Sequence, residues 1–291
     1  MAAVSPEEAV LMSPSPAVDP AAFQAFEHAG WESIVDAYDA AFRALTAQTI
    51  GPLLDATGVG PGTQVLDEAT GPGYVAAAAA DRGADVTAVD FAAAMVAEAR
   101  QQHPGLDMRQ ADVEALPFDD GSFAAVVMNF GALHLAQPDL AFAEAYRALR
   151  PGGGFAFTVW APPQVSAGFD MVLRAIHAHG TTNVLLPPGP PFFRFGDPAE
   201  STRSLQAVGF TDVQAVVLPL VWELPQPEAM LEVMQRATVR MAALLRAQSP
   251  DALAAIRAAV AEEAATYATG AGIAVPMGAT LTSGRKPATS P

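Results

Sequence analysis

Three acidic residues, Asp67, Asp90 and Asp112, stand near the ends of short apolar runs at nearly even spacing along the chain. The first is followed by Gly71-Pro72-Gly73, where glycines let the backbone turn sharply and approach a bound ligand. The carboxyl ends of parallel strands open into the ligand crevice of a doubly wound sheet. We therefore expect the three carboxylates to meet at one binding site.

Asp90 is the acid with the most specific expected chemistry. It ends the predicted strand 86–90, about as far downstream as a βαβ unit places its ribose-binding acid. A carboxylate offers only acceptors, so it suits two vicinal hydroxyls. The glycine motif lacks the third glycine of the dinucleotide fingerprint and is weak alone, but the ordered acids make it specific.

The segments between these acids predict an alternating α/β core. Residues 123–129 form an apolar run suited to a central strand buried on both faces. A helix is expected over 140–149, and the Pro-Gly-rich segment 150–154 is expected to stop it. Further strands are predicted at 86–90, 108–111, 155–160, 213–221 and 275–283.

Four segments in this order resemble class I S-adenosylmethionine-dependent methyltransferases, of the small-molecule kind typified by quinone biosynthesis; they are residues 65–73, 89–91, 111–118 and 149–158. The resemblance covers about residues 45–162, and more loosely 197–221 and 273–286. It implies a Rossmann-like doubly wound α/β sheet, mostly parallel with an antiparallel last strand and with helical lid insertions. It also implies S-adenosyl-L-methionine as the cofactor.

The chain length of 291 residues allows one large domain with insertions. The expected parts are a flexible arm (1–20), N-terminal lid helices (21–57), the cofactor-binding core (58–163), a lid insertion (164–196), a core continuation (197–223), a helical lid insertion (224–270) and a last core strand with a tail (271–291). Two helices are expected in 21–57. One helix each is expected over 227–246 and 251–267, and a rigid proline-rich loop over 186–193.

The resemblance assigns cofactor roles to residues that match the family's motifs. Asp67 would reach the amino group, Gly71 and Gly73 the methionine part, and Asp90 the ribose, while Asp112 and Val113 would read the adenine. Ala69, Phe91, Met95 and Asn129 complete the expected cofactor site. Alternatives stay open: Asp67 as a helix cap, Asp112 as a solvated loop acid, and Phe91 and Met95 as plain packing.

His134 is the candidate catalytic residue, because it follows the fourth strand and an imidazole can act as a general base near neutral pH. A packing histidine is the alternative. Aromatic residues outside the core indicate an apolar or aromatic acceptor, although core packing would explain at least half of them. The expected acceptor-binding residues are Trp31, Tyr38, Phe42, Phe193 and Trp222. No histidine pair with an acid suggests a metal site, so no metal is expected.

Glu68 departs from the family, which has an apolar residue at this position. Strand alternation turns its side chain away from Asp67 and into packing. There it should find a cation or a donor, or titrate with a raised pKa. It could be a structural substitution, a residue that binds or transfers a proton, or one that disables ordinary cofactor binding.

Charge and composition narrow the possible partners. Lys plus Arg number 15 and Asp plus Glu 31, so the net charge of −16 repels phosphate backbones and argues against nucleic acid. The chain has no cysteine, which excludes disulfides and thiolate metal sites. No run is long enough to span a bilayer and no signal-peptide pattern opens the chain. A cytoplasmic monomer or homodimer that acts on a small molecule is expected.

The function predicted from these features is methyl transfer from S-adenosylmethionine to a small, apolar or aromatic metabolite. Two alternatives keep the cofactor pocket without methyl transfer. One is a cyclase or pericyclase-like enzyme that uses the same fold, and the other is a regulatory binding protein.

Overall fold

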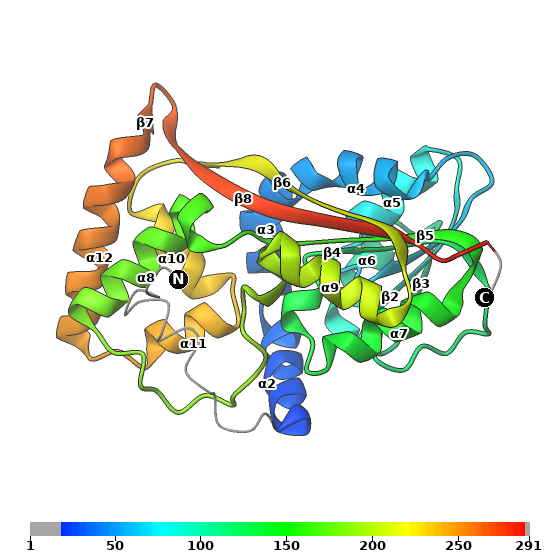
Figure 1. Cartoon of the computed structure of the whole chain (residues 1–291). Coiled ribbons are helices and arrows are strands. Elements are labelled where there is room, and N and C mark those ends of the chain that lie inside the picture. Colours follow the sequence, from blue (N-terminus) through cyan, green and yellow to red (C-terminus); the bar gives the residue numbers. More distant parts are fainter. Residues whose placement is uncertain (1–18, 289–291) are drawn as a thin grey trace.

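The structure, a computed structural model, describes residues 19–288, so the predicted N-terminal arm lies almost wholly outside the described residues. A mixed sheet with the strand order β3-β2-β1-β4-β5-β8-β6 forms its centre (Figure 1). Strands β1 to β5 run parallel, and β8 runs antiparallel to both β5 and β6. The strands are β1 (Gln64–Glu68), β2 (Asp85–Asp90), β3 (Asp107–Gln110), β4 (Phe123–Asn129), β5 (Leu149–Trp160), β6 (Thr211–Leu224), β7 (Ala268–Thr269) and β8 (Gly272–Arg285). The predicted Rossmann-like fold is confirmed.

Strand β4 is buried on both faces, as its apolar sequence predicts. Val126 and Met128 belong to one hydrophobic cluster, and Ala125 and Val127 to another on the opposite face. Helices α4 (Ile50–Thr57), α5 (Tyr74–Asp81) and α6 (Ala93–Gln102) cover one face, and α7 (Pro138–Ala148) and α9 (Pro198–Val208) cover the other. The centre of the sheet is therefore covered on both faces.

The N-terminal segment contains one more helix than predicted. Helix α2 (Pro20–Ser33) begins after Asp19, whose carboxylate accepts hydrogen bonds from two backbone N–H groups of the first turn. Helix α3 (Val35–Thr46) and a 3₁₀ turn then precede α4. The break between α2 and α3 falls at Ile34, a residue whose side chain cannot cap a helix.

The helix predicted over 227–246 is wrong, because two helices, α10 (Ala229–Arg236) and α11 (Arg240–Arg246), occupy this range. Thr238 lies at the break. Its hydroxyl donates to the Met234 carbonyl at 2.6 Å and accepts from the Ala242 N–H at 3.0 Å. The side chain thus ends one helix and starts the next, which is how hydroxyl residues compete with helical backbone bonds. The predicted stop at 150–154 is also displaced, since the helix ends at Ala148 and β5 begins at Leu149.

Helices α8 (Ala167–His179), α10, α11 and α12 (Pro250–Ala264) gather beside the sheet (Figure 1). Strand β8 pairs with β5 only from Ala279 onward, but it pairs with β6 from Ile273. The β6–β8 ribbon therefore continues past the end of β5 and carries the insertion between β6 and β8. These segments match the predicted lid insertions in position, and their enclosure of an acceptor stays a prediction.

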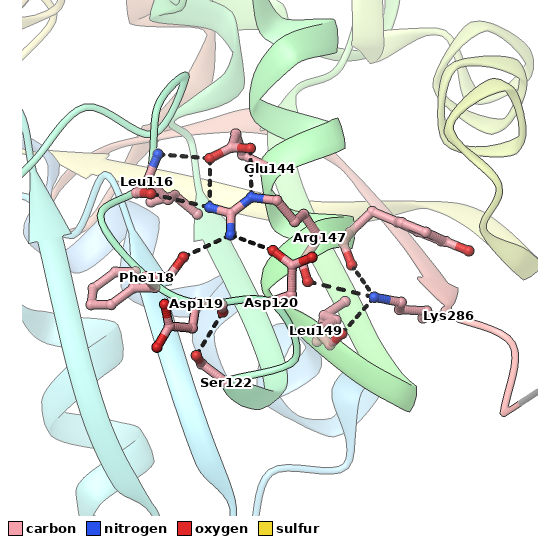
Figure 2. A network of polar contacts seen from close by, with 10 residues as sticks. Leu116, Phe118, Asp119, Asp120, Ser122, Glu144, Arg147, Leu149 and Lys286 are labelled. Carbon is pink, nitrogen blue, oxygen red and sulfur yellow. Dashed lines mark hydrogen bonds and ion pairs between the residues drawn. The ribbon is translucent and has the colours of Figure 1, made fainter. Parts of the chain in front are cut away.

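Arg147 of α7 anchors the loop that follows β3 (Figure 2). Its guanidinium donates to the Leu116 carbonyl at 3.1 Å, to the Phe118 carbonyl at 2.6 Å and to the Asp120 carboxylate at 2.9 Å. Glu144 accepts from the Leu116 N–H at 2.8 Å and pairs with the same guanidinium. A planar donor fork that joins several acceptors fixes the loop that carries one of the predicted cofactor-binding acids.

Glu68 is wholly buried, and neither carboxylate oxygen has a hydrogen-bond partner among residues 19–288. It ends β1 on the side of α7, where Glu144 is a nearby charge, whereas Asp67 bonds to α5. The two side chains thus point to opposite faces, as strand alternation predicts. Burial, reinforced by the charges of Asp67 and Glu144, raises the pKa of Glu68 well above 4.5. The carboxyl therefore remains neutral at pH values at which an exposed glutamate would be ionised.

This burial predicts a pH-dependent stability. Because the folded pKa is raised, Glu68 contributes stability that is complete below its unfolded value of about 4.5 and is lost as the pH rises toward the folded pKa. Urea denaturation should show that Glu68→Gln removes this component. The variant should therefore gain stability relative to the natural protein between pH about 5 and about 8.

Glu68→Val provides the matched apolar substitution, and it should raise the free energy of unfolding at pH about 8 by roughly 1–3 kcal/mol. Asp90 is present in all three proteins, so its titration cancels in the comparison. Parallel pH profiles for the natural protein and Glu68→Gln would contradict the burial of an unpaired carboxyl.

Candidate active site

A pocket of about 690 Å³, partly open to solvent, lies at the carboxyl ends of β1, β2 and β4. The parallel strand order brings these ends to one edge of the sheet. The pocket collects eight of the predicted cofactor residues: Ala69, Gly71, Asp90, Phe91, Met95, Asp112, Val113 and Asn129. Trp31, Tyr38 and His134 also line it, so candidates for cofactor binding, acceptor binding and catalysis share one cavity.

The two motif glycines occupy different surroundings. Gly71 has a φ of +54°, and no atom lies within 4 Å of the place where a Cβ would stand. Its backbone is thus open to a ligand in the pocket. Gly73 has a φ of +87°, and an added Cβ would lie 2.8 Å from the Met108 side chain. Gly73 does not line the pocket and instead allows close packing at the start of α5.

Asp90 is held by backbone donors from two segments. One oxygen accepts from the Gly71 N–H at 2.9 Å and the other from the Ala92 N–H at 3.0 Å. Burial raises the pKa of Asp90 to about 6, although these N–H groups oppose the shift. The group is therefore mainly ionised at neutral pH. Each carboxylate oxygen can accept further bonds, so the residue can still meet hydroxyl donors.

Asp67 does not line the pocket. It is buried, and one oxygen accepts from the Thr70 hydroxyl at 2.5 Å and from the Ala76 N–H of α5 at 3.0 Å. These contacts are those of the helix-capping alternative. The other oxygen has no partner among the described residues. Burial raises the pKa of Asp67 to about 7, and contact between this acid and a cofactor stays a prediction.

Asp112 lies in the pocket and contacts a residue that no sequence motif indicates. Its Oδ2 accepts from the Gln24 side-chain amide of α2 at 2.6 Å, and its Oδ1 accepts from the Glu114 N–H at 2.9 Å. Gln24 and Glu114 also line the pocket. The N-terminal helix thus reaches the acid that is predicted to read an adenine.

Asn129 is fixed from three sides. Its Oδ1 accepts from the hydroxyls of Thr49 at 2.7 Å and Thr158 at 2.5 Å, and its Nδ2 donates to the Thr46 carbonyl at 3.3 Å. The following residue, Phe130, has a φ of +54°, and this backbone conformation is strained for residues other than glycine. This turn places Phe130 in the pocket wall.

His134 lies in a short 3₁₀ turn after β4, with its side chain 18% exposed. Its Nδ1 lies 3.0 Å from a carboxylate oxygen of Glu27, a wholly buried residue of α2. The edge of the ring faces Trp31, with centroids 4.7 Å apart and planes at 84°. Trp31 also donates its indole N–H to the same Glu27 oxygen at 3.1 Å.

Three predicted acceptor-binding residues lie outside this pocket. Phe42 and Trp222 are each 2% exposed and pack on one another with centroids 4.8 Å apart. The Trp222 indole also donates to the Ala41 carbonyl at 3.2 Å. Phe193 packs on Phe169 and Phe192. Core packing, the alternative considered for the aromatic set, accounts for these three positions.

Two of the polar residues missed in the sequence, Gln24 and Glu27, come from α2. They recur with the predicted Trp31 at the three- and four-residue spacing of one helix face. Polar side chains on a face that also carries Phe23 and Trp31 were the available signal. Pattern alone does not show which part of the molecule that face contacts.

Two negative findings apply to residues 19–288. No group of three or more His, Asp or Glu side chains there could hold a metal ion. Within the same described range, no helix is long and apolar enough to cross a membrane.

Comparisons with known proteins agree with this geometry. Residues 66–157 match a family model described as a methyltransferase domain. A demethylmenaquinone methyltransferase of Beutenbergia cavernae is 41% identical over 121 residues, which are 40% of this chain and 50% of that protein. The matched part of the chain thus spans about half the length of this relative.

Solved structures show the same fold at low identity. The YcgJ protein of Bacillus subtilis matches with a TM-score of 0.53 and 19% identity, over 82% of this chain and 98% of that one. The [4+2]-cyclase SpnF matches with a TM-score of 0.50 and 21% identity, over 84% and 82%. Together with the sheet order, the sequence match shows that residues 66–157 of this chain form a methyltransferase domain on a Rossmann-like sheet.

Proposed function

We propose that the protein transfers a methyl group from S-adenosyl-L-methionine to a small, apolar or aromatic metabolite. The observation that carries the proposal is one pocket lined by Gly71, Asp90 and Asp112 and also by His134. The first three match the family's cofactor motifs. The fourth supplies a proton acceptor in the same cavity.

The pocket residues fit the cofactor in their chemistry. Asp90 would accept the ribose hydroxyls, since its carboxylate is held in place by backbone N–H groups and has acceptor capacity left. Asp112 would accept from the adenine amine in place of Gln24. The open space beside Gly71 leaves room for ligand atoms close to the backbone. When bound, the cofactor supplies an electrophilic methyl group.

The pocket also carries apolar and aromatic side chains. Trp31, Tyr38, Phe130 and Leu135 line it. Burial raises the pKa of Tyr38 far above its ordinary range, so its hydroxyl stays neutral and cannot serve as a base near neutral pH. This surface favours an apolar or aromatic acceptor, and it leaves His134 as the group for proton removal.

The work of the protein is then alignment and deprotonation. Holding the acceptor against the donor in a fixed orientation can supply several kcal/mol of barrier reduction, about 7–11 kcal/mol at most. His134 would take the proton from an acceptor hydroxyl or amine as the new bond forms. Such general-base catalysis contributes roughly 10²–10⁴-fold in rate.

Cofactor binding gives the first test of this function. Calorimetry should show one binding site per chain for S-adenosylmethionine or its demethylated product. Asp90→Ala should weaken binding by about 1.5–3 kcal/mol, because charge-assisted hydrogen bonds to the ribose are lost. Asp85→Ala is the matched control, since Asp85 is an exposed acid at the opposite end of the same strand. Equal affinity in the two variants would refute the ribose assignment.

Transfer of label gives the second test. Purified protein with methyl-labelled cofactor should pass label to an apolar small molecule in a fractionated metabolite extract or in a panel of phenols and hydroquinones. His134→Gln should lower the rate by roughly 10²–10⁴-fold while cofactor affinity is kept. Conversion of a metabolite without label transfer, in a protein that binds the cofactor, would replace methyl transfer by the cyclase-like alternative.

A further inference from the structure

We propose that Glu27 is a positioning residue that holds His134 in the form able to act as a base. This inference rests on the function proposed above. Glu27 belongs to α2, outside the matched methyltransferase domain, and its carboxylate lies behind the pocket histidine at 3.0 Å from Nδ1. It does not itself line the pocket, so it acts through the imidazole.

The hydrogen bond fixes the tautomer of His134. A carboxylate only accepts, so the proton of a neutral imidazole must sit on Nδ1 when that nitrogen faces Glu27. The lone pair then belongs to Nε2, on the other side of the ring. No group among residues 19–288 forms a hydrogen bond with Nε2, and the ring lines the pocket. The basic nitrogen is therefore the one available to an acceptor.

The carboxylate behind the imidazole has few other partners. Glu27 is wholly buried, and its Oε1 has no hydrogen-bond partner among the described residues. Arg240 of α11 acts on it through space, but these two side chains form no ion pair within 4 Å. Among residues 19–288, a protonated His134 would be the one cation within hydrogen-bond distance of this carboxylate. A proton taken from the acceptor would thus arrive beside an opposite charge.

A second donor sets the orientation of the carboxylate. The Trp31 indole N–H bonds to the same oxygen as His134, at 3.1 Å. A side chain in which that atom were a nitrogen would face the Trp31 indole N–H, which can only donate. The amide of a glutamine at position 27 must therefore turn its oxygen toward both rings. This arrangement separates the effect of the hydrogen bond from the effect of the charge.

The pair spans two parts of the molecule. Glu27 lies on α2, while His134 lies on the core after β4. Helix α2 is held at its two ends by other contacts: Gln24 bonds to Asp112, and Glu32 accepts from the N–H groups that begin α6. The hydrogen bond between Glu27 and His134 therefore forms only when α2 packs against the core.

Nitrogen-15 NMR of the imidazole tests the tautomer without any acceptor. Histidine-labelled protein is compared with Glu27→Gln, Glu27→Leu and the control Asp36→Asn, which removes an exposed acid of the neighbouring helix. His134→Gln identifies the resonances. The natural protein, Asp36→Asn and Glu27→Gln should show neutral His134 protonated on Nδ1, and Glu27→Leu should populate the Nε2-protonated form.

Kinetics with a methyl acceptor complete the test. Glu27→Leu should lower kcat by roughly 10²–10⁴-fold with unchanged cofactor affinity, because the base is lost. Glu27→Gln keeps the tautomer but not the charge, so its kcat should lie between those of Glu27→Leu and the natural protein. Asp36→Asn should match the natural protein.

The outcomes separate this inference from the function on which it rests. An Nδ1-protonated His134 in Glu27→Leu, or an Nε2-protonated one in the natural protein, would overturn the positioning role whatever the activity. The expected tautomers in a protein that transfers no methyl group would support the positioning of His134 and refute methyl transfer.

Discussion

Desolvation of carboxylates at one edge of the sheet is the constraint on which this site depends. Glu27, Asp67, Glu68 and Asp90 are each at most 5% exposed. A buried charge needs donors or a counter-charge, or it becomes neutral. Asp90 accepts hydrogen bonds from backbone N–H groups, and Asp67 accepts them from a hydroxyl and from the first turn of a helix. The rings of His134 and Trp31 bond to Glu27. Among residues 19–288, Glu68 has no such donor or counter-charge. Its protonation therefore differs from that of its neighbours.

Much of the core could be predicted because its signals are local. Residues 123–128 are apolar without interruption, and a strand of that kind belongs at the centre of a parallel sheet. The placement of Asp90 and Asp112 in one pocket then follows, since parallel strands end at a common edge. Turn chemistry was less visible: the hydroxyl of Thr238 breaks a helix that apolar periodicity would continue.

The contacts of α2 could not be predicted, because they depend on how a helix docks on a distant strand end. Gln24 and Asp112 are 88 residues apart, and Glu27 and His134 are 107 apart. Nothing local sets either pairing. The fold is equally silent on the reaction, since a [4+2]-cyclase shares it. The contacts that the fold does not specify lie where segments outside residues 66–157 meet the domain.

The β6–β8 ribbon has a mechanical consequence. Because the two strands stay paired beyond the end of β5, the insertion that they carry is tethered at both of its ends by a doubled strand. Two paired strands resist bending more than a single strand does. Helix α2 has no comparable brace, since side-chain contacts at Gln24, Glu27 and Glu32 hold it to the core. Ligands should therefore enter and leave the pocket on the side of α2, the helix that carries the proposed positioning residue Glu27.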